Sequence, residues 1–126
     1  MTARVVIADD DVDIRALVRI SATRAGFEIV AEVGDGDAAL AAVREFAPDL
    51  AILDVTMPGL TGVEVCRAVR EDPALDAVRI LLLSAAVGEV SMATGLEAGA
   101  AAYFEKPFSP RELTASLIGV LGGAPS

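Results

Sequence analysis

Short apolar segments alternate with longer amphipathic segments five times along the chain, and this alternation restricts the fold more than any other feature. The short segments predict β-strands at residues 4–8, 27–33, 49–55, 78–85 and 101–104. Apolar residues at helical spacing predict helices near residues 12–25, 37–46, 62–71, 89–98 and 110–121. Strands that alternate with helices form parallel sheets, because each helix carries the chain back to the start of the next strand.

Two of the predicted strands, "AILD" at 51–54 and "ILLLS" at 80–84, are apolar at successive positions rather than at alternate ones. Strands of this type are covered on both faces. We therefore expect an α/β fold, a doubly wound five-stranded parallel sheet with five helices on its two faces. The residues expected at helix ends agree with this: Asp11 as an N-cap, Gly26 and Gly99 after helices, and Ser109-Pro110 at the start of the last helix.

The composition fits one globular domain of 126 residues. We expect this domain over residues 1–121, followed by a flexible tail or the start of a linker at 122–126. The net charge is −9 and no segment concentrates Lys or Arg, so direct binding of nucleic acid or of a membrane is not expected. The lone Cys66 is expected to be a buried core residue, since there is no His to activate it, and cysteine usage favours a cytoplasmic location.

Polar side chains follow the predicted strands at the points where the strands end. The set comprises Asp9, Asp10, Asp54, Ser84 and Lys106. Because ligands of doubly wound sheets bind outside the carboxyl ends of the strands, these groups should gather at one edge. Neighbouring carboxylates repel by about 1 kcal/mol in water and about 4 kcal/mol near a protein surface. Three carboxylates and one ammonium balance only with a divalent cation, and oxygen donors without His indicate Mg²⁺, with Mn²⁺ as a substitute.

Each of these residues also has a plain structural interpretation. Asp9 and Asp10 alone could form a solvated helix N-terminus, which suits Asp11 and Asp13 better. Lys106 alone could be a surface charge, and a serine such as Ser84 often caps backbone groups. The coincidence of five such groups at strand ends favours a functional site.

The ordered motifs "ADD" at 8–10, "LDVTMPGLTG" at 53–62, "LLLSA" at 81–85 and "YFEKPF" at 103–108 carry a family resemblance. Over residues 4–121 the chain resembles the receiver domain of bacterial two-component response regulators. The resemblance implies the flavodoxin-like strand order 2-1-3-4-5. It also implies that residues 1–121 are a receiver domain that carries one phosphorylation site.

The resemblance implies a role for each matching residue. Asp54 would be the phosphoacceptor and, with Asp10 and the backbone carbonyl of Thr56, a direct Mg²⁺ ligand, while Asp9 would act largely through water. Lys106 would pair with phosphoryl oxygens, aimed inward by a cis Lys106–Pro107 bond. Ser84 would donate to the phosphoryl group, and Tyr103 would be the aromatic switch, although a half-buried core ring explains Tyr103 equally well.

The expected function is two-component signal transduction. The phosphoryl group would come from the phosphohistidine of a sensor histidine kinase or a histidine phosphotransfer protein. The chain would catalyse only its own phosphorylation and dephosphorylation, so it is not expected to be an enzyme. Phosphorylation would switch the surface of the fourth helix, fifth strand and fifth helix, about residues 89–121.

The output is less constrained by the sequence. A downstream protein or a fused output domain would read the switch. Residues 89–121 offer few bases for the salt-bridged dimer of many DNA-binding relatives, which favours a stand-alone receiver or the receiver part of a longer protein whose output is not DNA binding. A weak homodimer on phosphorylation stays open.

Three alternatives belong to other classes. A haloacid-dehalogenase-like phosphohydrolase would carry its nucleophile on an early strand with a second Asp two residues later, where this chain has Thr56. A flavodoxin-like flavin carrier would need a phosphate-binding first loop in place of "ADDD". A receiver-like adaptor that is not regulated by phosphorylation should lack one of the charged groups.

Overall fold

The computed structural model describes residues 2–85, 92–106 and 108–122. It contains one five-stranded sheet whose paired strands are all parallel and whose order is β2-β1-β3-β4-β5. The strands are β1 (Arg4–Ala8), β2 (Glu28–Val33), β3 (Leu50–Asp54), β4 (Arg79–Ser84) and β5 (Ala102–Glu105). The predicted strands and the order implied by the family resemblance are confirmed.

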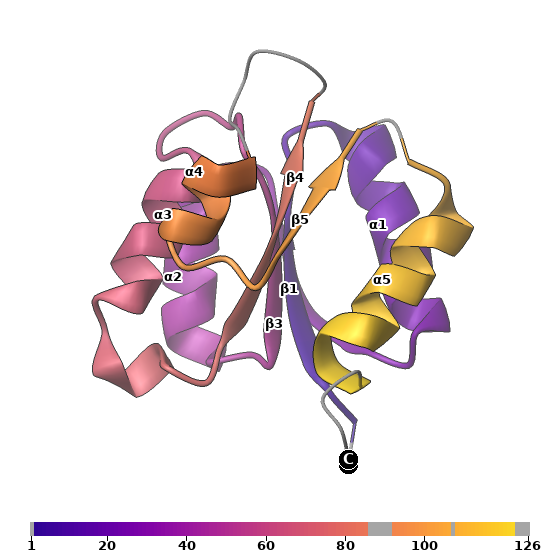
Figure 1. Ribbon diagram of the computed structural model, residues 1–126, viewed down its shortest axis with the longest axis horizontal. Coiled ribbons are helices and arrows are strands. Elements are labelled where there is room, and N and C mark those ends of the chain that lie inside the picture. Colours follow the sequence, from indigo (N-terminus) through magenta and orange to yellow (C-terminus); the bar gives the residue numbers. More distant parts are fainter. Residues whose placement is uncertain (1, 86–91, 107, 123–126) are drawn as a thin grey trace.

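Helices cover both faces of the sheet, with α1 and α5 on one face and α2, α3 and α4 on the other (Figure 1). They are α1 (Val12–Arg24), α2 (Gly36–Phe46), α3 (Gly62–Arg70), α4 (Met92–Glu97) and α5 (Pro110–Gly122). A short 3-10 helix, η1 (Pro73–Leu75), precedes β4 and was not predicted. In the described part of the chain, no helix combines the length and the apolar character that crossing a bilayer requires.

Two element boundaries bear on the sequence predictions. Helix α5 extends through Gly122, one residue into the expected tail. The remaining tail residues, 123–126, and the predicted start of the fourth helix at 89–91 lie outside the described residues.

The core consists of two clusters, one on each face of the sheet. Val6, Leu53 and Leu82 point toward α2, α3 and α4, whereas Ile7 and Ile52 point toward α1 and α5. Successive residues of a strand face opposite sides, so a strand covered on both faces must be apolar at every position. All five residues of β3 are buried, which places Asp54 at the end of the most enclosed strand.

The predicted helix ends and the predicted burial of the cysteine are confirmed. The Asp11 carboxylate accepts hydrogen bonds from the backbone N–H groups of Asp13 and Ile14, and Ser109 caps α5 through the N–H of Glu112. Cys66 is fully buried and donates to the carbonyl of Ala98 at 3.3 Å. Burial raises the pKa of its thiol to about 11, so the thiol is not a nucleophile at neutral pH.

Candidate functional site

The register of the sheet brings the strand-end residues together. Leu53 pairs with Ala8, Asp54 pairs with Leu83, and Ser84 pairs with Glu105. Asp9 directly follows Ala8 and Lys106 directly follows Glu105, and the Lys106 N–H donates to the Ser84 carbonyl at 2.7 Å. The carboxyl ends of β1, β3, β4 and β5 therefore meet at the level of Asp54, as the sequence predicted.

Asp9 is completely buried, and both of its carboxylate oxygens have partners. Oδ1 accepts from the backbone N–H of Asp11 at 2.9 Å, and Oδ2 accepts from Lys106 Nζ at 3.0 Å. A buried carboxylate requires such partners, because an unpaired charge out of water is very unfavourable. Asp9 is thus fixed in place and in turn holds the lysine.

Lys106 bridges two acids from different strands. Its ammonium donates to Asp9 and, at 3.1 Å, to Oδ1 of Asp54, and its side chain is 17% exposed. The predicted inward direction of Lys106 agrees with this geometry, whereas Pro107, and with it the predicted cis bond, lies outside the described residues. The interpretation of Lys106 as a solvated surface charge is wrong.

The third carboxylate, Asp10, is exposed but lies at the same place. Asp9, Asp10 and Asp54 each offer one carboxylate oxygen, and these three atoms lie within 4.8 Å of one another. Three carboxylates against the single ammonium of Lys106 leave an excess of two negative charges. An all-oxygen donor set with that charge fits a hard divalent cation such as Mg²⁺.

The charges of the site perturb its proton equilibria. Burial of Asp54, followed by the charge of Asp9, raises the pKa of Asp54 to about 6, against the lowering effect of Lys106. Burial of Lys106 acts to lower its pKa, but hydrogen bonds and charge from Asp9 and Asp54 outweigh burial, and the pKa of the ammonium is raised. Three ionised carboxylates are therefore unfavourable in the metal-free site, and a bound cation would offset their repulsion.

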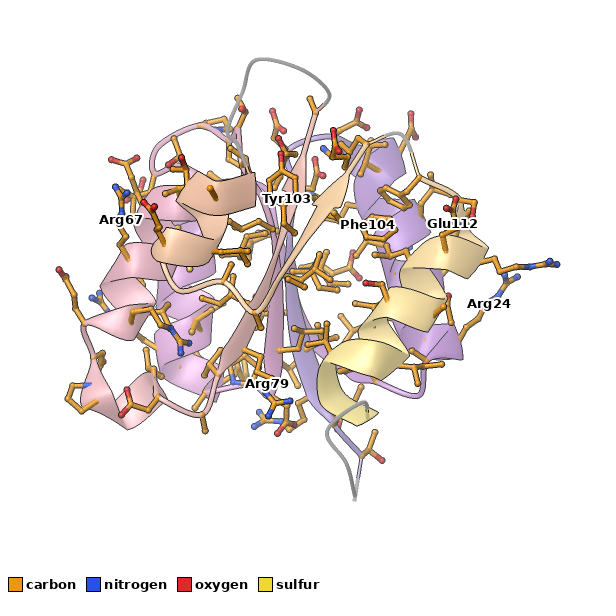
Figure 2. The ribbon with its side chains drawn as sticks, viewed as in Figure 1. Arg24, Arg67, Arg79, Tyr103, Phe104 and Glu112 are labelled. Atoms are coloured by element: carbon orange, nitrogen blue, oxygen red, sulfur yellow. The ribbon has the colours of Figure 1, made fainter. Side chains whose placement is uncertain are left out.

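The remaining predicted residues lie at the end of β4, in the loop after β3 and on β5. Ser84 is fully buried and its hydroxyl donates to the carbonyl of Ala85 at 3.0 Å. Thr56 is exposed in the loop after β3. Tyr103 is half-buried against the core on the α4 side of the sheet, while Phe104 faces the opposite side (Figure 2). Ser84 thus lies at the carboxyl edge of the sheet, whereas Tyr103 lies within β5, opposite Leu82 of β4.

Arg15 is a neighbour of the site that the sequence analysis did not single out. Its guanidinium donates to the backbone carbonyl of Asp9 at 3.0 Å and lies 3.8 Å from the carboxylate of Glu32. Glu32 also accepts two hydrogen bonds from Arg19, at 2.7 and 2.8 Å, and this contact lowers the pKa of Glu32. The arginine on the first turns of α1 thus ties the loop of Asp9 to β2. No sequence pattern distinguished Arg15 from an ordinary solvated arginine on a helix.

Comparison with known proteins identifies relatives of the whole fold. The chain matches the response regulator receiver domain family over residues 5–118. It is 43% identical over 115 residues to the DNA-binding response regulator MtrA of Mycolicibacterium paratuberculosis. The aligned segment covers 91% of this chain and 49% of that protein. The chain therefore spans about half the length of this curated relative.

Solved structures agree with the sequence match. A putative response regulator from Chloroflexus aurantiacus superimposes with a TM-score of 0.88 at 32% identity, covering 97% of this chain and 99% of that one. The chemotaxis response regulator CheY4 of Vibrio cholerae superimposes with a TM-score of 0.86 at 34% identity, covering 96% and 100%. The chain belongs to the receiver domains of two-component response regulators, whose general function is to be phosphorylated on an aspartate.

Proposed function

We propose that Asp54 accepts a phosphoryl group from the phosphohistidine of a sensor histidine kinase or a histidine phosphotransfer protein. The observation that carries the proposal is the position of Lys106, whose ammonium contacts both Asp9 and Asp54 at the end of the central strand. Phosphoryl transfer depends mainly on positioning and on neutralising charge, and this site supplies both.

The residues that would hold Mg²⁺ are Asp10, Asp54 and the backbone carbonyl of Thr56, with Asp9 acting largely through water. Bound there, Mg²⁺ or Mn²⁺ would neutralise the acids so that an anionic phosphoryl group can approach Asp54. In the transfer, an Asp54 carboxylate oxygen forms a bond to phosphorus as the bond from phosphorus to the histidine nitrogen breaks. The departing imidazole nitrogen takes up a proton, and the product is an acyl phosphate.

Lys106 and Ser84 act on the product. The ammonium of Lys106, already 3.1 Å from Asp54, stabilises the added negative charge as a compact point charge. The Ser84 hydroxyl turns from the Ala85 carbonyl to donate to a phosphoryl oxygen. New contacts of this kind are how an added phosphoryl group biases a two-state surface. In this chain that surface comprises α4, β5 and α5, with Tyr103 as the aromatic residue that responds.

The proposal extends to the setting of the domain. Residues 1–121 would form the receiver domain, with 122–126 as a flexible tail or the start of a linker, although α5 includes Gly122. The chain catalyses only its own phosphorylation and dephosphorylation. We place it in the cytoplasm, where cysteines such as the free Cys66 stay reduced. The output passes to a downstream protein or a fused domain. The relative MtrA is named a DNA-binding protein, so a fused DNA-binding domain is a stronger alternative than the sequence alone indicated.

Acetyl phosphate tests the chemistry directly. With Mg²⁺, the wild-type protein should gain the mass of one phosphoryl group, and excess chelator should prevent this. Asp54→Asn should gain none, whereas Asp76→Asn, which changes an exposed acid before β4, should behave as the wild type. An adduct of equal yield on Asp54→Asn would rule out Asp54 as the acceptor.

A further inference from the structure

We propose that Gly36, the first residue of α2, is a positioning residue for the loop between β3 and α3, and that Mg²⁺ binding is therefore coupled to the N-terminus of α2. The inference rests on the proposed function, because it takes the backbone carbonyl of Thr56 in this loop as a Mg²⁺ ligand. Helix α2 is not part of the proposed response surface of α4, β5 and α5. The coupling would therefore connect the metal site to a further helix.

The loop is held tightly at its α3 end. The Gly62 N–H donates to the Val55 carbonyl at 2.9 Å, and a side chain on Gly62 would overlap the carbonyl oxygen of Asp54. Thr61 and Glu64 then form a capping box that fixes the start of α3. The backbone that follows Asp54 is thus closed into a compact turn before the helix begins.

Helix α2 holds the opposite side of the same loop. The Gly36 N–H donates to the Pro58 carbonyl at 3.0 Å. A Cβ atom on Gly36 would overlap the Leu60 carbonyl oxygen and would lie 2.5 Å from the Leu60 carbonyl carbon. These are backbone atoms, which cannot rotate aside as the end of a side chain can. Only glycine permits this approach at position 36.

Asp37 and Gly59 form a second contact between α2 and the loop. Gly59 has a φ of +76°, a conformation that favours glycine, and a Cβ atom there would overlap the carboxylate of Asp37. The first two residues of α2 thus touch three successive loop residues, Pro58, Gly59 and Leu60. The N-terminus of α2 is itself capped, since the Asp35 side chain accepts a hydrogen bond from the Ala38 N–H at 2.7 Å.

These contacts have a consequence for a metal ligand in the loop. A carbonyl binds Mg²⁺ well only when its position is fixed beforehand, because Mg²⁺ tolerates little departure from octahedral geometry. Groups that orient a ligand typically change metal affinity by 10- to 100-fold when they are altered. By linkage, a metal that is bound better with the Gly36 contact in place must also stabilise that contact.

Calorimetric titration with Mg²⁺ tests the role of Gly36. We expect Gly36→Ala to raise the Kd for Mg²⁺ roughly tenfold or more. The matched control is Gly119→Ala on α5, where an added Cβ meets no atom within 4 Å, and it should leave the Kd unchanged. A purely structural role would lower the melting temperature of Gly36→Ala without metal and leave the Kd of its folded state at the wild-type value, which would overturn the proposal.

Amide hydrogen exchange in the wild-type protein gives a second measurement that does not depend on the variant folding. Saturating Mg²⁺ should slow exchange of the Gly36 amide, which donates to Pro58. The Glu28 amide, which donates to the Ala3 carbonyl at the opposite edge of the sheet, should be much less affected. Equal slowing of both amides, or no slowing at Gly36, would contradict the coupling.

Asp10→Asn separates this inference from the proposed function. If Asp10→Asn binds Mg²⁺ as the wild type does, the acidic cluster is not the metal site and both proposals fail. If Asp10→Asn loses Mg²⁺ and Gly36→Ala does not, the proposed function stands and only the role of Gly36 is overturned.

Discussion

The three central strands differ from the two edge strands in how completely they are enclosed. In β1, β3 and β4 every residue except the first of β1 and the first of β4 is buried. In β2 and β5 no residue is fully buried. A central strand packs against neighbours on both sides as well as on both faces, whereas an edge strand has one free side.

The functional groups divide along the same line. Asp9, Asp54 and Ser84 stand at the ends of the central strands, while Tyr103 and Lys106 belong to the edge strand β5 and the residue that follows it. Rigid elements hold reacting groups more accurately than mobile ones. Elements with few buried contacts open and shift most easily. The acids therefore lie at the ends of the enclosed strands, whereas Lys106 and Tyr103, two of the groups that we propose respond to phosphorylation, lie on or next to an edge strand.

One pair of matched substitutions tests this difference in packing. Ile52 on β3 and Ile29 on β2 both face the core cluster beneath α1 and α5, but only Ile52 is fully buried. Ile52→Ala should lower the free energy of unfolding by roughly 2–5 kcal/mol, and Ile29→Ala by clearly less. Urea unfolding of the two variants measures both values. Equal losses would show that the β2 edge is packed as tightly as the centre.

The second prediction concerns the charge that the centre of the fold encloses. The pKa of Asp54 is about 6 in the folded protein and 3.8 ordinarily. Between these values the folded state binds more protons than the unfolded state. The free energy of unfolding of the metal-free protein should therefore fall as the pH rises from about 4 to about 6, by at most about 3 kcal/mol from this group.

Denaturant unfolding at several pH values, with chelator present, measures this contribution as the difference between the wild type and Asp54→Asn. The difference is needed because Glu32, whose hydrogen bond with Arg19 lowers its pKa, contributes with the opposite sign. If the two proteins show the same pH dependence, Asp54 titrates at its ordinary value and the site is more hydrated than its burial indicates.

The sequence predicted those parts of the fold and site that depend on local patterns. Unbroken apolar segments predicted the strands, and the acids directly after them predicted which edge carries the site. The strand order came only from the family resemblance, because alternation alone fits several orders of a parallel sheet.

Contacts between distant segments could not be predicted in the same way. The approach of Gly36 to Leu60 leaves no local signal, since a glycine before a helix also serves as an ordinary turn residue. Arg15 was overlooked because an arginine on a first helical turn is usually solvated, and because its hydrogen bond at the site is to the backbone carbonyl of Asp9. In both cases the contact that bears on the site is made to backbone atoms, which every sequence supplies.

The last prediction concerns the weakest link between centre and edge, the one from Ser84 to Tyr103. Ser84→Ala removes a buried hydroxyl that donates to the Ala85 carbonyl at 3.0 Å, and we expect it to lower the free energy of unfolding by about 1 kcal/mol, the typical contribution of one hydrogen bond. The variant keeps Asp54, Asp10 and Lys106, so it should still accept a phosphoryl group. In the wild type, we expect phosphorylation to draw the hydroxyl inward and vacate space beneath α4.

Tyr103 is placed to respond to that space. Its ring packs against the core on the α4 side, and a Cβ atom on Gly95 of α4 would lie 3.4 Å from the ring. A densely packed interior does not leave a void beside a movable ring, so Tyr103 should rotate inward when the hydroxyl moves.

Beryllofluoride with Mg²⁺ mimics the phosphoryl group, and the NMR signals or fluorescence of Tyr103, the sole tyrosine, report the rotation. Ser84→Ala should lose this response, whereas Ser116→Ala on α5 should keep it. If Ser84→Ala responds as the wild type does, the hydroxyl does not couple the site to Tyr103, and another connection between β4 and α4 must carry the signal.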